Sequence, residues 1–81
     1  MRVRVRLFAR LRELAGADEI ALEVPEGARV EEVWERLAAA HPALAAHRRS
    51  VSAAVNAEFA RMQTRVGAGD EVAFLPPVSG G

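Results

Sequence analysis

The feature that most constrains this fold is a single long apolar stripe at residues 30–41. Glu31 and Glu32 in its first turn suit the positive end of a helix dipole, and Pro42 ends the helix. The stripe residues recur with helical spacing: Val30, Val33, Trp34, Leu37, Ala38 and His41. No second full-length helix is indicated, so this one must bury its apolar side against a sheet.

The segments before this helix alternate apolar and polar residues, as half-buried strands do. We expect strands at residues 2–8 and 19–24. Their apolar side chains point to the helix: Val3, Val5, Leu7, Ile20, Leu22 and Val24. Between these strands, "ARLRELAG" predicts one or two short helical turns capped at Gly16. The two strands therefore pair as a hairpin joined through that turn.

The second half of the chain predicts two more strands and allows a short fifth. The first runs through Val51, Ala53 and Val55, Asn56 suits a turn, and residues 71–75 form the last strand. "ALAAHRRS" is assigned only as a loop or a frayed extra turn. The result is an α+β fold, a mixed four- to five-stranded sheet covered on one face by one main helix. A β-grasp arrangement fits this order, whereas a ferredoxin-like fold would need a second full-length helix.

The composition excludes several kinds of chemistry. The 81 residues include no cysteine and no lysine, which removes disulfides, thiolate metal sites, thiol nucleophiles and Schiff bases. Eleven basic and eleven acidic residues give a formal net charge of zero, so no long-range field favours nucleic acid or membrane as a partner. The start, "MRVRVRLF", lacks the apolar stretch of a signal peptide, and the expected compartment is the cytoplasm.

Few polar side chains suggest a catalytic or metal site. His41 and His47 have no carboxylate cluster near them, and we expect both to be structural or on the surface. Ser50, Ser52 and Ser79 lack the pattern of a hydrolase nucleophile. Neither glycine-rich turn resembles a phosphate loop, since "GAGD" leads into a strand and not into a helix N-terminus. The sequence therefore predicts no metal and no cofactor bound by this chain.

The arginines of the first strand allow two interpretations. Arg2, Arg4 and Arg6 could form a basic stripe for RNA or phosphate. Glu19 and Glu23 can lie opposite them on the neighbouring strand. A solvated face of cross-strand ion pairs is the favoured interpretation.

Phe8, Phe59 and Leu75 lie near strand ends and predict an exposed apolar patch, the usual mark of a partner surface. After them, two prolines end sheet pairing and favour an extended exit. The terminal glycines have no Cβ and could pass through a narrow channel. We expect residues 1–75 to form the folded domain and residues 76–81 a flexible, extended Gly-Gly tail.

The chemistry of such a tail resides in its carboxylate. This group is ionised at neutral pH and is a poor electrophile until an adenylating enzyme activates it. The domain offers no catalytic groups of its own, so activation and later use must occur inside partners. The end at Gly81 is interpreted as a reactive arm, and the alternative is an inert tail on a binding module.

Three segments, "FARLRELAG", "AAVN" and "GDEVAFLPPVSGG", resemble a known family. They are similar to the small, sulfur-carrying subunits of molybdopterin synthase, the MoaD/ThiS family of the ubiquitin-like β-grasp superfamily. The resemblance implies that a ubiquitin-activating-type enzyme adenylates Gly81 with ATP and that a thiocarboxylate follows. The arm would then donate sulfur to cyclic pyranopterin monophosphate in the large catalytic subunit. The small subunit would be non-catalytic alone.

The resemblance also implies a docking surface for both partners and a heterotetramer with two large subunits. The residues that it assigns to partner binding are Phe8, Phe59, Leu75, Pro76, Pro77, Val78, Ser79 and Gly80. Two alternatives stay open. One is a sulfur carrier for thiamine or tRNA thiolation, and the other is a ubiquitin-like modifier that forms isopeptide bonds with other proteins.

Overall fold

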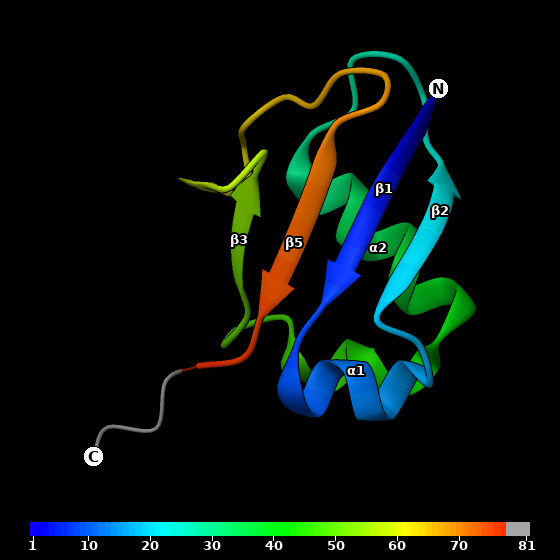
Figure 1. Cartoon of the computed structure of the whole chain (residues 1–81), viewed down its shortest axis with the longest axis vertical. Coiled ribbons are helices and arrows are strands. Elements are labelled where there is room, and N and C mark those ends of the chain that lie inside the picture. The colour runs from blue at the N-terminus through cyan, green and yellow to red at the C-terminus, as the bar shows by residue number, and fades with distance from the viewer. Residues whose placement is uncertain (78–81) are drawn as a thin grey trace.

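The computed structural model describes residues 1–77, in which a mixed sheet lies in front of one long helix (Figure 1). The predictions for Val78, Ser79, Gly80 and Gly81 lie outside the described residues. The elements are β1 (Arg2–Leu7), α1 (Ala9–Ala15), β2 (Glu19–Glu23), α2 (Val30–Ala40), the 3-10 helix η1 (Pro42–His47), β3 (Ser52–Val55), β4 (Glu58–Ala60) and β5 (Glu71–Leu75).

The sheet has the strand order β2-β1-β5-β3-β4. The two central strands, β1 and β5, run parallel, and the other neighbouring pairs are antiparallel. Five strands with one main helix across one face confirm the predicted α+β architecture. The short strand β4, which the sequence left as a possibility, is present at the edge of the sheet.

Helix α2 packs across the sheet because its apolar stripe faces the inward side chains of the central strands. Its buried residues include Trp34 and Leu37, and the sheet contributes Val5 and Phe74, both fully buried. The rings of Trp34 and Phe74 meet edge to face, with centroids 5.0 Å apart and planes at 68°. This contact joins the middle of the helix to β5.

The backbone at the start of α2 is better hydrogen-bonded than its sequence suggests. No Ser, Thr, Asp or Asn stands at the N-cap position, which is occupied by Arg29. The Glu32 carboxylate instead accepts a hydrogen bond from the Arg29 backbone N–H at 3.1 Å. This is the half of a capping box that depends on the acidic residue.

Two short helices, α1 and η1, accompany α2. Helix α1 ends as predicted, because Gly16 adopts a left-handed φ of 75° and its N–H donates to the Arg12 carbonyl. The segment that the sequence assigned to a loop or a frayed turn is the 3-10 helix η1. Leu44 is its one buried residue, so the sequence contains no apolar periodicity from which this helix could be predicted.

Candidate docking surface beside the end of β5

The sheet face opposite α2 divides into two halves with different chemistry. In the half near the N-terminus, Arg2 pairs with Glu23 at 3.0 Å and Arg4 with Glu19 at 3.9 Å. The antiparallel register of β1 and β2 places these residues opposite or diagonal to one another. The interpretation as cross-strand ion pairs is therefore confirmed for this half.

The other half, toward the end of β5, is mainly apolar. Backbone pairing aligns Arg6, Ala73, Ala54 and Phe59 in one row across four strands. The following row contains Leu75, which pairs with Ser52, and Phe8, which follows Leu7. We call the apolar members of these two rows the outer patch: Phe8, Ala54, Phe59, Ala73 and Leu75.

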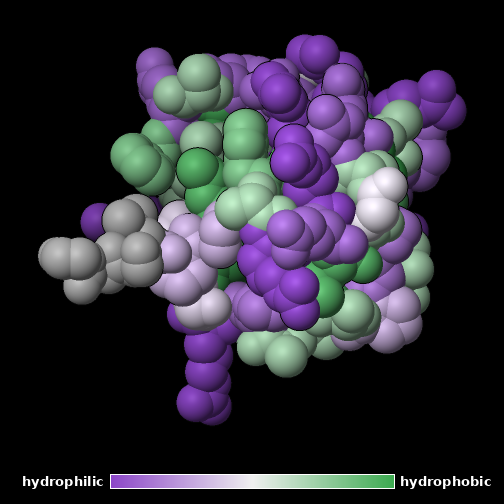
Figure 2. All heavy atoms as spheres, turned by 60° about the horizontal axis from the view of Figure 1, so that its bottom comes forward, coloured by the Kyte–Doolittle hydropathy of each residue, from purple (hydrophilic) through white to green (hydrophobic). Residues whose placement is uncertain are grey.

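Exposure differs among the three residues that the sequence singled out. Phe59 is 87% exposed and Phe8 is 38% exposed, whereas Leu75 is half-buried. The Arg6 guanidinium lies 5.4 Å from the centroid of the Phe8 ring, within the range of a cation–π contact. Figure 2 turns this end of the molecule forward and shows hydrophobic and strongly hydrophilic residues side by side on it.

The three residues do not form one compact cluster. Phe8 directly follows β1 and Leu75 ends the adjacent strand β5, but Phe59 is on the edge strand β4, with β3 between β4 and β5. Ala54 and Ala73 fill the space between them. The sequence did not single out these alanines, although strict alternation along β3 and β5 would have placed both on the outer face.

Ala73 is only 8% exposed, although it points away from the helix. Its side chain is a single methyl group, and longer side chains flank it in the same row on β1 and β4. Beyond β5, Pro76 is half-buried and Pro77 is exposed. The chain therefore leaves the sheet directly beside Leu75.

A polar network fixes the opposite end of β3 and β5. Asn56 has a φ of 49°, its backbone N–H donates to the Glu71 carbonyl at 2.8 Å, and its side-chain carbonyl accepts from the Glu71 N–H at 3.0 Å. The Asp70 carboxylate accepts from the Gly67 N–H at 2.7 Å and from the Asn56 amide at 3.1 Å. These bonds, led by that from Gly67, lower the pKa of Asp70.

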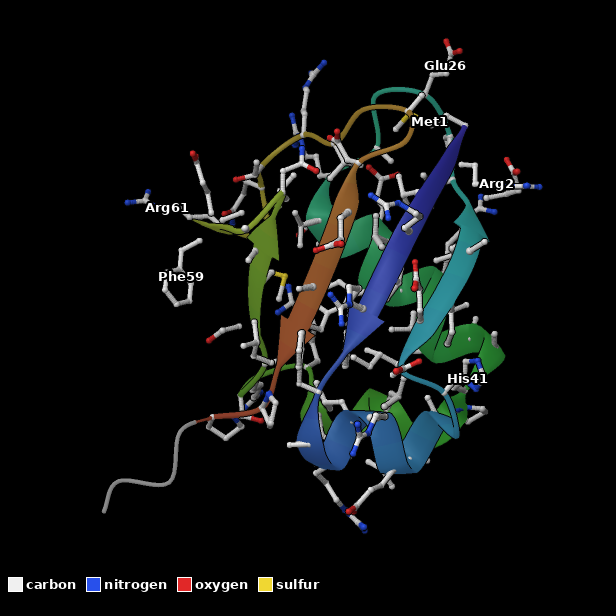
Figure 3. All side chains as sticks on the ribbon, viewed as in Figure 1. Met1, Arg2, Glu26, His41, Phe59 and Arg61 are labelled. Carbon is white, nitrogen blue, oxygen red and sulfur yellow. The ribbon has the colours of Figure 1, made fainter. Side chains whose placement is uncertain are left out.

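The remaining candidates stay outside this surface. His41 ends α2 on the side of the molecule away from Phe59 (Figure 3), and His47 is the last residue of η1. Among residues 1–77, no three His, Asp or Glu side chains gather as a metal site would require. No helix in this range is long and apolar enough to cross a membrane.

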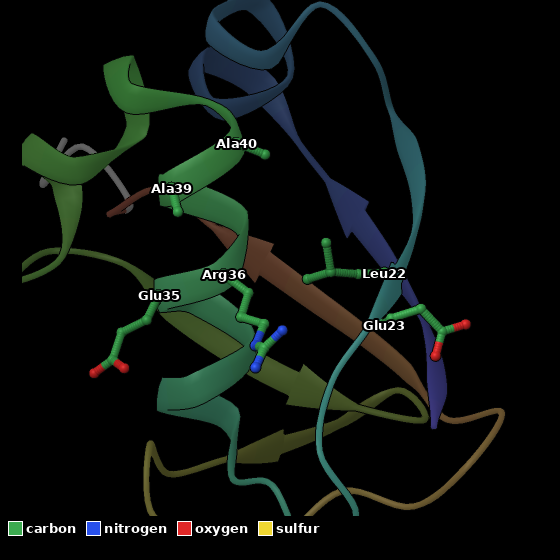
Figure 4. A pocket seen from close by; sticks show the side chains of 6 residues that line it. All are labelled: Leu22, Glu23, Glu35, Arg36, Ala39 and Ala40. Carbon is green, nitrogen blue, oxygen red and sulfur yellow. The ribbon is translucent and has the colours of Figure 1, made fainter.

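A second surface feature lies on the far side of the molecule. A groove of about 600 Å³ runs between β2 and α2, lined by Leu22, Ala39, Ala40 and three charged side chains (Figure 4). One of these is Arg36, which is exposed. Since β2 and β5 are separated by β1, this groove is remote from the chain exit.

Comparison with known proteins gives concordant matches. The model of the ThiS family matches residues 5–81. The molybdopterin synthase sulfur carrier subunit of Chlamydomonas reinhardtii is 41% identical over 83 residues, covering 100% of both chains. The crystal structure of SAMP1 from Haloferax volcanii has a TM-score of 0.87 and 34% identity, covering 100% of both chains.

A more distant solved structure is the complex of subunits 1 and 2 of the molybdopterin-converting factor from Helicobacter pylori. One of its chains matches with a TM-score of 0.70 and 22% identity, again covering 100% of both chains. At that identity the likeness shows the fold alone. It establishes that the arrangement of β1 to β5 around α2 recurs in a two-subunit assembly.

Proposed function

This chain belongs to the ThiS family, and from that membership we propose that it is a sulfur carrier for the biosynthesis of the molybdenum cofactor. The observation that carries the proposal is the match over residues 5–81, joined by the full-length identity of 41% to a molybdopterin synthase sulfur carrier subunit. The matched range includes Gly81, the residue to which the chemistry is assigned.

In the proposed cycle, the reacting group is the Gly81 carboxylate. It attacks the α-phosphate of ATP within a ubiquitin-activating-type enzyme, which releases pyrophosphate and leaves an acyl adenylate. A sulfur nucleophile then displaces AMP, and the chain end becomes a thiocarboxylate. In the large synthase subunit, that sulfur forms a bond to cyclic pyranopterin monophosphate, and water hydrolyses the bond between the sulfur and the Gly81 acyl carbon, which regenerates the carboxylate.

The folded domain binds the partners and directs the chain end toward their active sites. We assign partner binding to the outer patch, to Pro76 and Pro77, and to residues 78–80 that follow. An exposed aromatic side chain such as Phe59 is typical of protein interfaces. We propose one assembly with two large subunits and another with the activating enzyme, which consumes ATP in the cytoplasm.

The proposal is tested by intact mass spectrometry after incubation with ATP, the activating enzyme and a sulfur donor. We expect one oxygen at Gly81 to be replaced by one sulfur. Deletion of Gly81, or addition of one alanine after it, should abolish this change without affecting thermal unfolding. Retention of sulfur transfer by either variant would show that the chain end is not the reactive group.

A protein modifier is the second candidate, favoured by the similarity to SAMP1, a small archaeal modifier protein. A modifier would use the same adenylate but would transfer it to lysine amines. This chain contains no lysine, so conjugates could form only on other proteins. Adducts on partner lysines in the same incubation would support this function, whereas the thiocarboxylate alone supports the carrier.

A further inference from the structure

A positively charged hollow adjoins the outer patch at the edge of the sheet. It has a volume of about 440 Å³ and lies between the start of β3 and the segment from β4 to Gln63. Its lining includes Arg48, Arg61, Ser52 and Phe59, and no aspartate or glutamate. Figure 3 shows Phe59 and Arg61 projecting from the same edge of the molecule.

Within residues 1–77, neither arginine is neutralised by a close carboxylate. Arg48 lies 3.9 Å from Glu31, and both side chains are well exposed, so the pair is long and weak. Arg61 takes part in no ion pair within residues 1–77. Its backbone is nevertheless held in place, because its N–H donates to the Thr64 hydroxyl at 3.1 Å. Arg2, by contrast, forms a direct ion pair with Glu23.

The hollow is continuous with the outer patch. Phe59 belongs to both, and Ser52, which also lines the hollow, pairs with Leu75 of the patch. A protein that covers Phe59 and Leu75 will therefore also approach Arg48 and Arg61. Water would be displaced from their guanidinium groups, and such groups are stabilised at an interface when a carboxylate meets them.

We propose that this hollow receives an acidic side chain, aspartate or glutamate, from the large synthase subunit that docks on the outer patch. The inference rests on the proposed function and adds the kind of partner surface that the chain recognises. The apolar contact supplies the buried area, and the two arginines select a partner with negative charge at the matching position. Their charge is local, because the whole chain has a formal net charge of zero.

The test compares charge reversals in the hollow with a matched reversal elsewhere. Arg48→Glu and Arg61→Glu change the hollow, and Arg36→Glu makes the same change in net charge beside the remote groove. Surface plasmon resonance with the immobilised large subunit gives association rates in about 0.1 M and about 1 M NaCl, where the Debye length is about 10 Å and about 3 Å. Thermal unfolding verifies that each variant is folded.

We expect each hollow variant to associate about tenfold more slowly than the wild type at the lower salt concentration, with most of the difference lost at the higher one. Arg36→Glu should stay within about twofold, and Arg61→Lys should preserve the wild-type rate because it keeps the charge. Equal rates for the hollow variants and Arg36→Glu would overturn the inference. Absence of any binding between the wild type and the large subunit would overturn both the proposed function and this inference. Binding that depends on Phe59 but not on the two arginines would overturn this inference alone.

Discussion

A substitution of Phe59 separates the effect on docking from the effect on folding. Its side chain is 87% exposed on the edge strand β4, so it contributes little to the core. The Phe59→Ala substitution should change the free energy of unfolding by no more than about 0.5 kcal/mol, as expected of a surface position. The same substitution should weaken binding to the large synthase subunit.

The size of that loss follows from the exposed ring. Burying a phenylalanine removes about 150–250 Å² from water, which at about 25 cal/mol per Å² sets an upper limit of roughly 4–6 kcal/mol. Ordering of side chains on association offsets part of this, and a central aromatic contact commonly costs about 2 kcal/mol when truncated. We therefore expect the dissociation constant to rise by about 30-fold.

The assay measures two quantities on each variant, the dissociation constant by isothermal titration calorimetry and the free energy of unfolding by urea titration. Leu22→Ala is the control, because Leu22 is half-buried beside the remote groove and should lose stability with unchanged binding. Wild-type affinity in Phe59→Ala would refute the assignment of this edge to docking. Equal fractional losses of binding in both variants would show that binding follows stability instead.

Two further predictions concern the polar end of the sheet. Ala57 has a φ of 70°, which favours glycine, so Ala57→Gly should stabilise the fold by about 1 kcal/mol and raise the unfolding midpoint by several degrees in calorimetry. Asp70→Asn should cost about 1 kcal/mol near neutral pH, because the two N–H donors face different carboxylate oxygens and one of these oxygens becomes an NH2 group that cannot accept. The pKa of Asp70 is lowered on folding, so its contribution is present above the ordinary value of 3.8 and is lost as the pH falls through the folded value. Urea titrations of both proteins should therefore converge in acid, and a constant difference down to pH 2 would contradict this.

The core of this fold could be predicted from the sequence because it depends on local periodicity. The stripe of α2 and the alternation in β1 identify the side chains that meet, and Val3, Val5, Val33 and Leu37 are all fully buried. The 3-10 helix η1 could not be identified in this way, since a single buried side chain, Leu44, produces no period. Its place depends on contacts with α1 and α2.

The candidate site was less predictable because it depends on strand order. Alternation shows that Phe8 and Leu75 leave the covered face, but only the pairing of β5 with both β1 and β3 shows which of the candidates are neighbours. The same pairing separates Phe59 from Leu75 by one strand. The charge of the hollow could not be predicted either, because Arg48 and Arg61 are 13 residues apart in the sequence and line the same hollow only through the β3–β4 hairpin.

Strand β5 joins the core of the fold to the outer patch. This strand is hydrogen-bonded on both sides, and its two faces have different roles. Val72 and Phe74 are fully buried against the helix side, whereas Ala73 and Leu75 belong to the outer patch. The segment that leads into the tail is therefore fixed by the core and lies within the docking surface. Under the proposed function, a partner that binds the patch also fixes the point at which residues 76–81 begin, so this one strand contributes both to stability and to docking.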